Sequence, residues 1–450
     1  MKAPRRSEVL KALPESATPL VVRLLVEADE RRMAVYLVGG PVRDWLLGRG
    51  VVDVDLLVEG REGAGAAELA RAAVPRDVKQ TTHERFGTVT LGAGGGIDLA
   101  TVRRERYEHV GALPTVEAGT LLEDLQRRDF TVNALALPLS REARVRHPEI
   151  VEVEGGLADL TQRRLRVLHP RSFHDDPTRA LRAARLAPRL GFTLSRGSRP
   201  ALRQALRDGA FGRVSGDRLR REIVKLFDDA RAGLDPSRAL RLLSEWHVLG
   251  ALEPGLGLDS AVMAPLRRLG RAVASPPWRH GRWRPWVVGL SLWLGAAAPS
   301  QRRHVLDRFS VRGATAVRIA GFVRARDGWM RALERARGRG AIDAVLRRLD
   351  EEELYGLYAS IAAPALRRRI VRYAVEDRGR RAPLGGDDLI GIGLEGQAVG
   401  RVLARIRAAY LDGTVCNREE ALVLARELVH RRAPPRTKRP PGKRKPAGRR

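Results

Sequence analysis

The segment from Leu37 to Gly60, LVGGPVRDWLLGRGVVDVDLLVEG, constrains the fold of this chain more than any other part of it. An apolar run over 34–38 ends at the pair Gly39–Gly40, and a second run over 51–58 carries two aspartates. This pattern predicts two strands, separated by a glycine turn and a short helix over 42–47. Glycines directly after a strand let the backbone approach a ligand closely and donate N–H groups to a phosphate.

The charged residues of this segment indicate phosphate and metal chemistry. Arg43 begins the short helix, where a guanidinium can bind phosphate oxygens. Asp53 and Asp55 are two residues apart on a predicted strand, so their carboxylates point to the same face. Two such acids repel each other unless a cation lies between them, and Mg²⁺ suits oxygen ligands of this kind. Taken alone, a glycine pair is usually only a turn and a D-x-D pair a solvated strand edge; their order and spacing together favour a site.

The remaining pattern predicts an α+β fold class, with a small mixed α/β head followed by an all-α neck, body and tail. The other elements predicted for the head are two helices and two strands, over 8–32, 64–73, 88–91 and 97–102. Asp98, on the last of these strands, either faces Asp53 and Asp55 or is a solvated edge residue. After Leu157 the apolar residues recur at helical spacing, as in the segments 177–190 and 218–228.

These motifs together resemble the nucleotidyltransferase core of the DNA polymerase β superfamily, in its class II tRNA nucleotidyltransferase and poly(A) polymerase branch. Three further segments follow in the order of that family. The run 127–134, RRDFTVNA, resembles the family's RRDFTxNA motif, and 155–160, GGLADL, resembles its flexible spring between head and neck. The run 175–179, DDPTR, resembles the EDxxR motif, with Asp175 where the family usually has Glu.

The resemblance implies a set of site residues. Asp53, Asp55 and Asp98 would be catalytic, and the first two would also hold Mg²⁺. The residues implied to bind the nucleotide are Gly39, Gly40, Arg43, Arg128, Asp129, Asn133, Asp176, Arg179, Arg182 and Arg185.

The EDxxR segment also carries an argument of its own. Asp176 and Arg179 are three residues apart on a predicted helix and so share a face. A carboxylate accepts hydrogen bonds and a guanidinium donates them, so the pair can match cytosine and adenine, which both show a donor beside an acceptor. A surface salt bridge is the alternative.

The resemblance also divides the chain. The predicted parts are an N-terminal helix over 1–33, a catalytic head over 34–140, a neck with the nucleotide-selecting helix over 141–230, a helical body and tail binding tRNA over 231–430, and a disordered basic tail over 431–450. The segment 103–126 is polar with few strand signals, and it resembles the flexible loop of members that add the terminal A. Four tryptophans between 278 and 293 either stack RNA bases or pack in a core.

Composition limits the partners and the location. Lys and Arg number 83 against 53 Asp and Glu, and ten of the basic residues lie in 431–450, where no acid occurs. A polyanionic partner such as RNA is the natural interpretation, and an arginine-rich genome is the alternative. The one cysteine, the lack of an apolar N-terminal segment and a longest apolar run of only 286–298 predict a cytoplasmic protein without a membrane span. No protein partner is implied.

The function implied by the resemblance is template-independent addition of CCA, or of its terminal A, to tRNA 3′ ends from CTP and ATP with release of pyrophosphate. A poly(A) polymerase is the alternative within the family. A non-catalytic RNA-binding protein is a third hypothesis, which the paired acids disfavour because a pure binder of anions has no use for them.

Overall fold

The structure, a computed structural model, describes residues 2–60, 65–83, 87–92, 96–106, 115–272, 277–278 and 281–430. The chain forms two compact units. The first contains the residues up to Asp229, with 234–259 and 297–316, and the second contains 230–233, 260–296 and the residues from Val317 onward. The predicted disordered tail, 431–450, lies outside the described residues.

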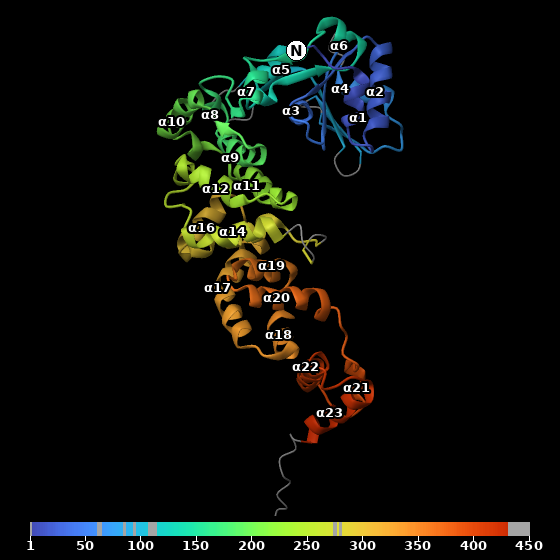
Figure 1. The fold of residues 1–450 in the computed structure, drawn as a ribbon, viewed down its shortest axis with the longest axis vertical. Coiled ribbons are helices and arrows are strands. Elements are labelled where there is room, and N and C mark those ends of the chain that lie inside the picture. Colours follow the sequence, from blue (N-terminus) through green and yellow to red (C-terminus); the bar gives the residue numbers. More distant parts are fainter. Residues whose placement is uncertain are drawn as a thin grey trace, which may run out of the picture. The chain divides into compact units, whose positions relative to one another are not determined.

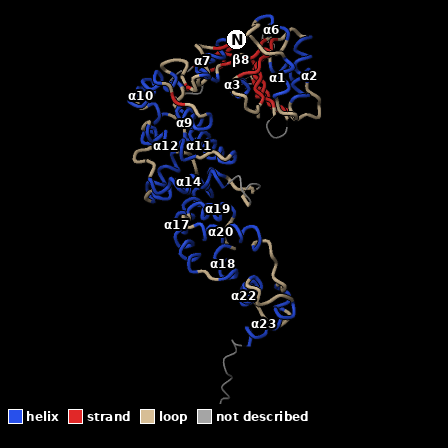
Figure 2. Tube along the Cα trace, viewed as in Figure 1, coloured by secondary structure: helices blue, strands red, loops and turns tan. Residues whose placement is uncertain are grey.

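The strands lie in the N-terminal part of the chain, ahead of a long series of helices (Figures 1 and 2). The described strands are β1 (Ala34–Val38), β2 (Val54–Glu59), β3 (Gln80–His83), β4 (Thr88–Leu91), β5 (Ile97–Thr101), β6 (Arg103–Arg106), β7 (Thr115–Ala118), β8 (Leu135–Pro138), β9 (Val151–Glu152), β10 (Arg164–Leu165) and β11 (Thr193–Leu194). Seven of them form one mixed sheet in the order β3-β4-β5-β2-β1-β8-β9, in which β2 and β5 are parallel and the other neighbours antiparallel.

Both faces of this sheet are covered, which explains why β1 is apolar at every position. Val35 and Leu37 point into one core, which also contains side chains of α1 (Arg6–Ala12), α2 (Thr18–Glu30) and α4 (Ala66–Ala73). Ala34, Tyr36 and Val38 point into a second core on the opposite face, with side chains of α5 (Leu121–Gln126) and α6 (Arg141–Arg146). The sheet is therefore a rigid support for the residues at its strand ends.

The rest of the described chain is helical apart from the short parallel pair β10–β11, so the predicted fold class is confirmed with this one addition to the neck. The helices that follow the head in the first unit are α7 (Gly156–Thr161), α8 (Ser172–Asp175), α9 (Thr178–Leu190), α10 (Arg199–Arg207), α11 (Gly216–Asp228), α12 (Pro236–Glu245), α13 (Val248–Leu252) and α16 (Pro299–Arg308). No helix among the residues described here is long and apolar enough to cross a membrane.

The N-terminal helix predicted over 8–32 was wrong in one respect, because the structure has two helices there, α1 and α2. Pro14 is the cause, since it has no N–H to donate and it disfavours helical geometry in the residue before it. Leu13 is accordingly extended, with φ −73° and ψ 158°. Pro19 causes no break, because it occupies the first turn of α2, where a proline is tolerated.

The segment 103–126, which was expected to be a flexible loop, contains more secondary structure than predicted. Its described parts contain the antiparallel strands β6 and β7 and the helix α5, whereas residues 107–114 lie outside the described residues. Every residue of β6 is charged, β7 carries the one acid Glu117, and Arg104 donates to Glu117 across the two strands at 2.8 Å. Such cross-strand ion pairs stabilise a polar hairpin that the usual apolar strand signal does not reveal.

The second unit contains the tryptophans and is built from helices alone in its described residues. They are α14 (Ser260–Ala272), α15 (Pro285–Trp293), α17 (Gly313–Arg335), which starts in the first unit, α18 (Gly338–Leu346), α19 (Glu351–Ser360), α20 (Pro364–Arg372), the π-helix η7 (Tyr373–Asp377), α21 (Gly386–Ile390), α22 (Gln397–Leu411) and α23 (Arg418–His430). Trp278, Trp283 and Trp293 are buried. These three tryptophans therefore belong to a core, and they do not stack RNA bases.

Candidate active site

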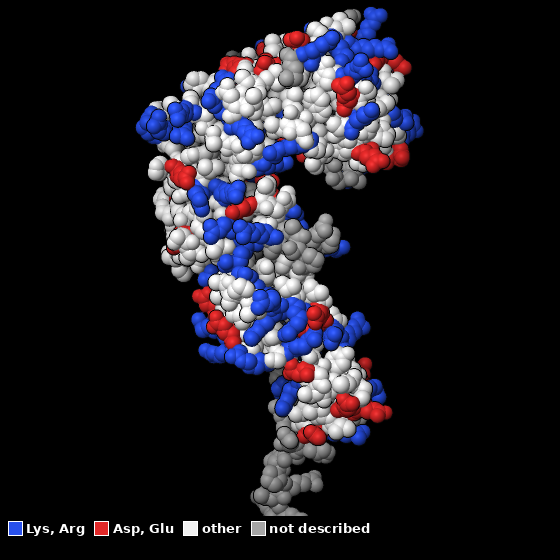
Figure 3. All heavy atoms as spheres, in the orientation of Figure 1, with Lys and Arg blue, Asp and Glu red and all other residues white. Residues whose placement is uncertain are grey.

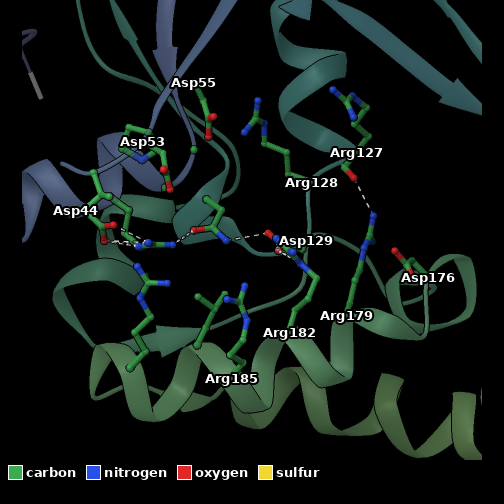
Figure 4. A pocket seen from close by; sticks show the side chains of 18 of the residues that line it. Asp44, Asp53, Asp55, Arg127, Arg128, Asp129, Asp176, Arg179, Arg182 and Arg185 are labelled. Atoms are coloured by element: carbon green, nitrogen blue, oxygen red, sulfur yellow. Dashed lines mark hydrogen bonds and ion pairs between the residues drawn. The ribbon is translucent and has the colours of Figure 1, made fainter. Parts of the chain in front are cut away.

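A pocket of about 430 Å³ lies in the first unit, and every site residue predicted from the sequence except Asp98 lines it. The strand predicted over 51–58 begins only at Val54, so Asp53 precedes β2 and Asp55 is its second residue. Both carboxylates enter the pocket from the start of β2, and the arginines of α9 enter from the opposite side (Figure 4). The pocket is therefore lined by acids at β2 and by arginines that come both from the head, such as Arg43 and Arg128, and from α9.

The glycine turn after β1 is required by its geometry. Gly39 has φ +73°, which L side chains rarely adopt, and a Cβ at this position would lie 2.6 Å from Nη1 of Arg128. The turn leads into α3 (Gly40–Leu46), whose buried Arg43 donates to both oxygens of Asp44 at 2.9 Å and to Oδ1 of Asn133 at 2.6 Å. The Arg43 guanidinium is therefore held in one orientation at the pocket wall.

The carboxylates near the start of the central strand β2 form the second feature. Asp55 and Asp98 are register partners on the parallel strands β2 and β5, so their side chains share a face, although Asp98 is exposed. Burial is the largest cause that raises the pKa of Asp55, the Arg128 charge opposes it, and Asp98 and Asp53 add to it, so that the pKa rises to about 6. Asp98 itself accepts from Thr90 at 2.6 Å and lies outside the pocket lining.

This arrangement fits a divalent cation. Asp55 carries a negative charge that burial and two neighbouring acids disfavour, and a cation between the carboxylates removes that cost. No group of three or more His, Cys, Asp or Glu residues in the described ranges could hold a metal ion by itself. A cation at Asp53 and Asp55 would therefore complete its shell with water or with phosphate oxygens, as Mg²⁺ commonly does.

Asp129 joins the head to the arginine helix α9. Its Oδ1 accepts from the backbone N–H of Phe130 at 2.8 Å and from Asn133 at 2.9 Å, and its Oδ2 accepts from Nε and Nη2 of Arg182, each at 2.8 Å. Burial alone would raise the pKa of Asp129, but the charge of Arg182 and the hydrogen bonds of Asn133 and Arg182 lower it to about 2. Asp129 is thus ionised, and it positions both Asn133 and Arg182.

The expected pairing of Asp176 with Arg179 is wrong in its detail. Asp176 precedes α9 in an extended conformation, and its Oδ1 accepts from the N–H and hydroxyl of Thr178 and from Arg218 at 2.7 Å. Arg179 is 4% exposed and donates to Ser172 Oγ at 2.6 Å and to the Arg127 carbonyl at 2.7 Å. Within the described residues, no side-chain hydrogen bond or ion pair joins the two, although both line the pocket.

Four charged pocket residues were not among the predicted site residues, although one of them, Arg127, lies in the motif 127–134. Arg189 follows Arg179, Arg182 and Arg185 on α9 at helical spacing, and this periodicity could have revealed it. Arg127 and Glu105 form an ion pair at 2.7 Å that joins β6 to the pocket. The fourth, Asp44, gave no signal beyond its position next to Arg43.

Comparison with known proteins agrees with this geometry. Residues 35–166 match the family described as the Poly A polymerase head domain. The A-adding tRNA nucleotidyltransferase of Geobacter sulfurreducens is 31% identical over 447 residues, which cover 94% of this chain and 49% of that protein. The CC-adding tRNA nucleotidyltransferase of Deinococcus radiodurans is 42% identical over 226 residues, which cover 50% of this chain and 57% of that protein. The chain thus spans about half the length of these relatives.

A solved structure extends the similarity over nearly the whole chain. The Thermotoga maritima CCA-adding enzyme complexed with tRNA superposes with a TM-score of 0.69 and 27% sequence identity, and the match covers 96% of this chain and 99% of the other. The shared fold therefore includes the helical second unit as well as the head.

Proposed function

We propose that the chain is a member of the family of tRNA nucleotidyltransferases and poly(A) polymerases, and that it adds CCA, or the terminal A of CCA, to the 3′ ends of tRNA. The observation that carries this proposal is the pocket itself. Paired carboxylates at the start of the central strand β2 face a row of arginines, which is what a reaction between an RNA hydroxyl and a nucleoside triphosphate requires.

The reaction follows from the two sides of the pocket. The RNA 3′-oxygen attacks the α-phosphorus, one P–O bond forms, and the bond to the β-phosphate breaks with release of pyrophosphate. Arg43 and Arg128 lie on the wall next to the glycine turn, where guanidinium groups can bind the triphosphate. They would hold the leaving group in line with the attacking oxygen, and positioning of this kind contributes a large part of phosphoryl-transfer catalysis.

Asp53 and Asp55 are the residues that would hold Mg²⁺. When bound there, Mg²⁺ lowers the pKa of the 3′-hydroxyl and neutralises charge that develops on the phosphate oxygens. Asp98 lies beside Asp55 and would act through it, because its carboxylate adds to the negative charge at that position without lining the pocket.

The choice of base is assigned to Asp176 and Arg179, which approach the pocket from different elements. All three contacts of Asp176 use Oδ1, so Oδ2 is the oxygen that would accept the exocyclic amino group of cytosine or adenine. Arg179 would supply the donor for the neighbouring ring nitrogen. Guanine and uracil present the opposite order and would be rejected.

The proposed substrates are CTP, ATP and tRNA, and the proposed location is the cytoplasm. A tRNA series tests the activity directly. Purified protein receives tRNA ending at the discriminator base, at C and at CC, each with CTP alone or ATP alone. Stepwise extension of all three ends gives CCA addition, and extension of the CC end only, with ATP, gives A addition.

Two results of the same series contradict the proposal. Long A tracts would show a poly(A) polymerase, which the tRNA nucleotidyltransferase relatives do not favour. Binding of tRNA without extension of any end would show a non-catalytic RNA-binding protein.

A further inference from the structure

A groove of about 520 Å³ runs along α20 in the second unit, and the reaction proposed above does not use it. One face of α20 and η7 lines the groove with Arg367, Arg368 and Arg372 and with the apolar side chains of Val371 and Val375. Tyr358, from α19, completes the lining. In Figure 3 this part of the second unit shows many basic side chains.

The ring of Tyr358 is a rigid aromatic surface. It stacks on Tyr355 with ring centroids 6.1 Å apart and an angle of 21° between the rings, and it contacts Trp278 at 5.8 Å. Both partners are buried, and the Tyr355 hydroxyl donates to the Leu269 carbonyl at 2.6 Å. The buried aromatic residues therefore hold Tyr358 in place at the groove while the ring itself stays half-buried.

The groove also carries more positive than negative charge. Arg367 is held by the carbonyls of Ile361 and Ala362 at 3.0 and 2.9 Å. Its charge lies close enough to Arg268 to add to the effect of burial in lowering the pKa of that residue. Glu376, the acid that lines the groove, already accepts a hydrogen bond at 2.9 Å from Arg339, which belongs to α18.

Arg368 and Arg372 differ in their partners. Arg372 Nε lies 3.9 Å from Asp377, a carboxylate that also accepts from Arg339 Nε at 2.9 Å. Arg368 is exposed, and among the described residues it has no ion pair. Arg367 and Arg368 are therefore the two groove cations available to an anion from outside.

We propose that this groove binds an unpaired nucleotide of the RNA substrate, with its base stacked on Tyr358 and the adjacent phosphates at Arg367 and Arg368. This inference rests on the proposed function only in taking RNA as the substrate. An aromatic ring flanked by arginines is the arrangement that binds single-stranded nucleic acid. Stacking on an aromatic ring accepts any base, because every base has a π-face.

The test measures RNA binding by the full chain without any catalytic step. The probes are a fluorescent tRNA transcript ending at the discriminator base and a short single-stranded RNA. Tyr358→Ala should weaken tRNA binding roughly 5- to 150-fold, the range of one lost stacking contact, whereas Tyr358→Phe, which keeps the ring, should bind as the wild type does. Thermal unfolding of both variants checks that the aromatic core is intact.

Arg368→Ala provides a second, independent variant that leaves the core untouched. It should reduce the slope of log K against log salt for the single-stranded RNA by about 0.7, the value for one phosphate contact. Arg23→Ala is the matched control, because Arg23 is an exposed arginine on α2 and its removal changes the net charge equally. The control should leave the slope unchanged.

The outcomes separate this inference from the proposed function. If wild-type protein binds tRNA but Tyr358→Ala and Arg368→Ala bind it equally well, the groove is not an RNA site, although the proposed function still stands. If AMP binding, followed by calorimetry, falls in Tyr358→Ala while RNA binding is unchanged, the groove holds a free nucleotide and the inference is wrong. If wild-type protein extends no tRNA end but Tyr358→Ala still weakens RNA binding, the proposed activity is wrong, whereas the groove is still an RNA-binding site.

Discussion

At the scale of single residues, the ionised form of Asp55 carries an electrostatic cost in the pocket. Its pKa is raised to about 6, mainly by burial and then by Asp98 and Asp53. A group whose folded-state pKa is raised stabilises the fold below its unfolded pKa, and this contribution is lost as the pH rises through about 4 to 6. At neutral pH without a cation, the ionised Asp55 is therefore a destabilising residue.

Asp55→Asn should accordingly raise the stability of the cation-free protein at pH 7.5 by on the order of 1–3 kcal/mol while abolishing nucleotide incorporation. The gain should narrow as the pH falls to 4.5, and added Mg²⁺ should stabilise the wild type more than the variant. Thermal unfolding at both pH values checks this, with the exposed Asp77→Asn as control. Equal midpoints of wild type and variant at pH 7.5 would show that Asp55 carries no such cost.

Arg179 tests the choice of base. Arg179→Ala removes the donor proposed for the ring nitrogen, so the preference in kcat/KM for CTP and ATP over UTP and GTP should fall roughly 5- to 150-fold. Because Arg179 is buried and donates to Ser172 and to the Arg127 carbonyl, the variant should also lose about 1–3 kcal/mol of stability. Arg189→Ala, on the same helix, is the control and should weaken all four nucleotides alike. An equal loss of kcat/KM for all four nucleotides in Arg179→Ala would show that Arg179 supports nucleotide binding or the fold and does not select the base.

At the scale of secondary-structure elements, the sequence revealed four strands of the seven-stranded sheet, β1, β2, β4 and β5, and missed β3, β8 and β9. β1 and β4 were predicted at their observed bounds, because short β-branched or apolar runs between glycines leave little choice. The helix break at Pro14 and the hairpin β6–β7 were missed, since the first depends on one residue within an amphipathic run and the second on charged cross-strand pairs. The pairing of Asp176 with Arg179 failed because it assumed a helix that begins only at Thr178.

The attachment of α9 to the head is also a prediction at this scale. Asp129→Asn removes the negative charge that binds Arg182 and should destabilise the head on the order of 3 kcal/mol, the cost of breaking a buried pair. Since the pKa of Asp129 is lowered to about 2, its contribution is present above about pH 4 and is lost as the pH falls through 2. The difference in the free energy of unfolding between wild type and variant, measured in urea, should therefore be the same at pH 7 and at pH 5. A difference that disappeared already at pH 5 would contradict the assignment.

At the scale of the whole molecule, the excess of basic residues predicts binding to RNA phosphates. Deleting 431–450 removes ten positive charges, so tRNA affinity should fall and the salt dependence of binding should flatten, because fewer counterions are released. Base selection should not change, since the pocket lies in the first unit. Fluorescence titrations over a range of salt concentrations measure this. An unchanged slope would mean that these charges do not contact RNA.

The most direct test of the account is single-nucleotide transfer to tRNA ending in CC from ATP labelled at the α-phosphate. The wild type should add one labelled A in the presence of Mg²⁺, with one pyrophosphate released for each A. Asp53→Asn should bind the same tRNA with unchanged affinity and transfer no label, because it loses a proposed ligand of the cation and leaves the RNA contacts intact. Wild-type turnover by Asp53→Asn, or a wild type that binds this tRNA and transfers nothing, would contradict the assignment of this pocket as the active site.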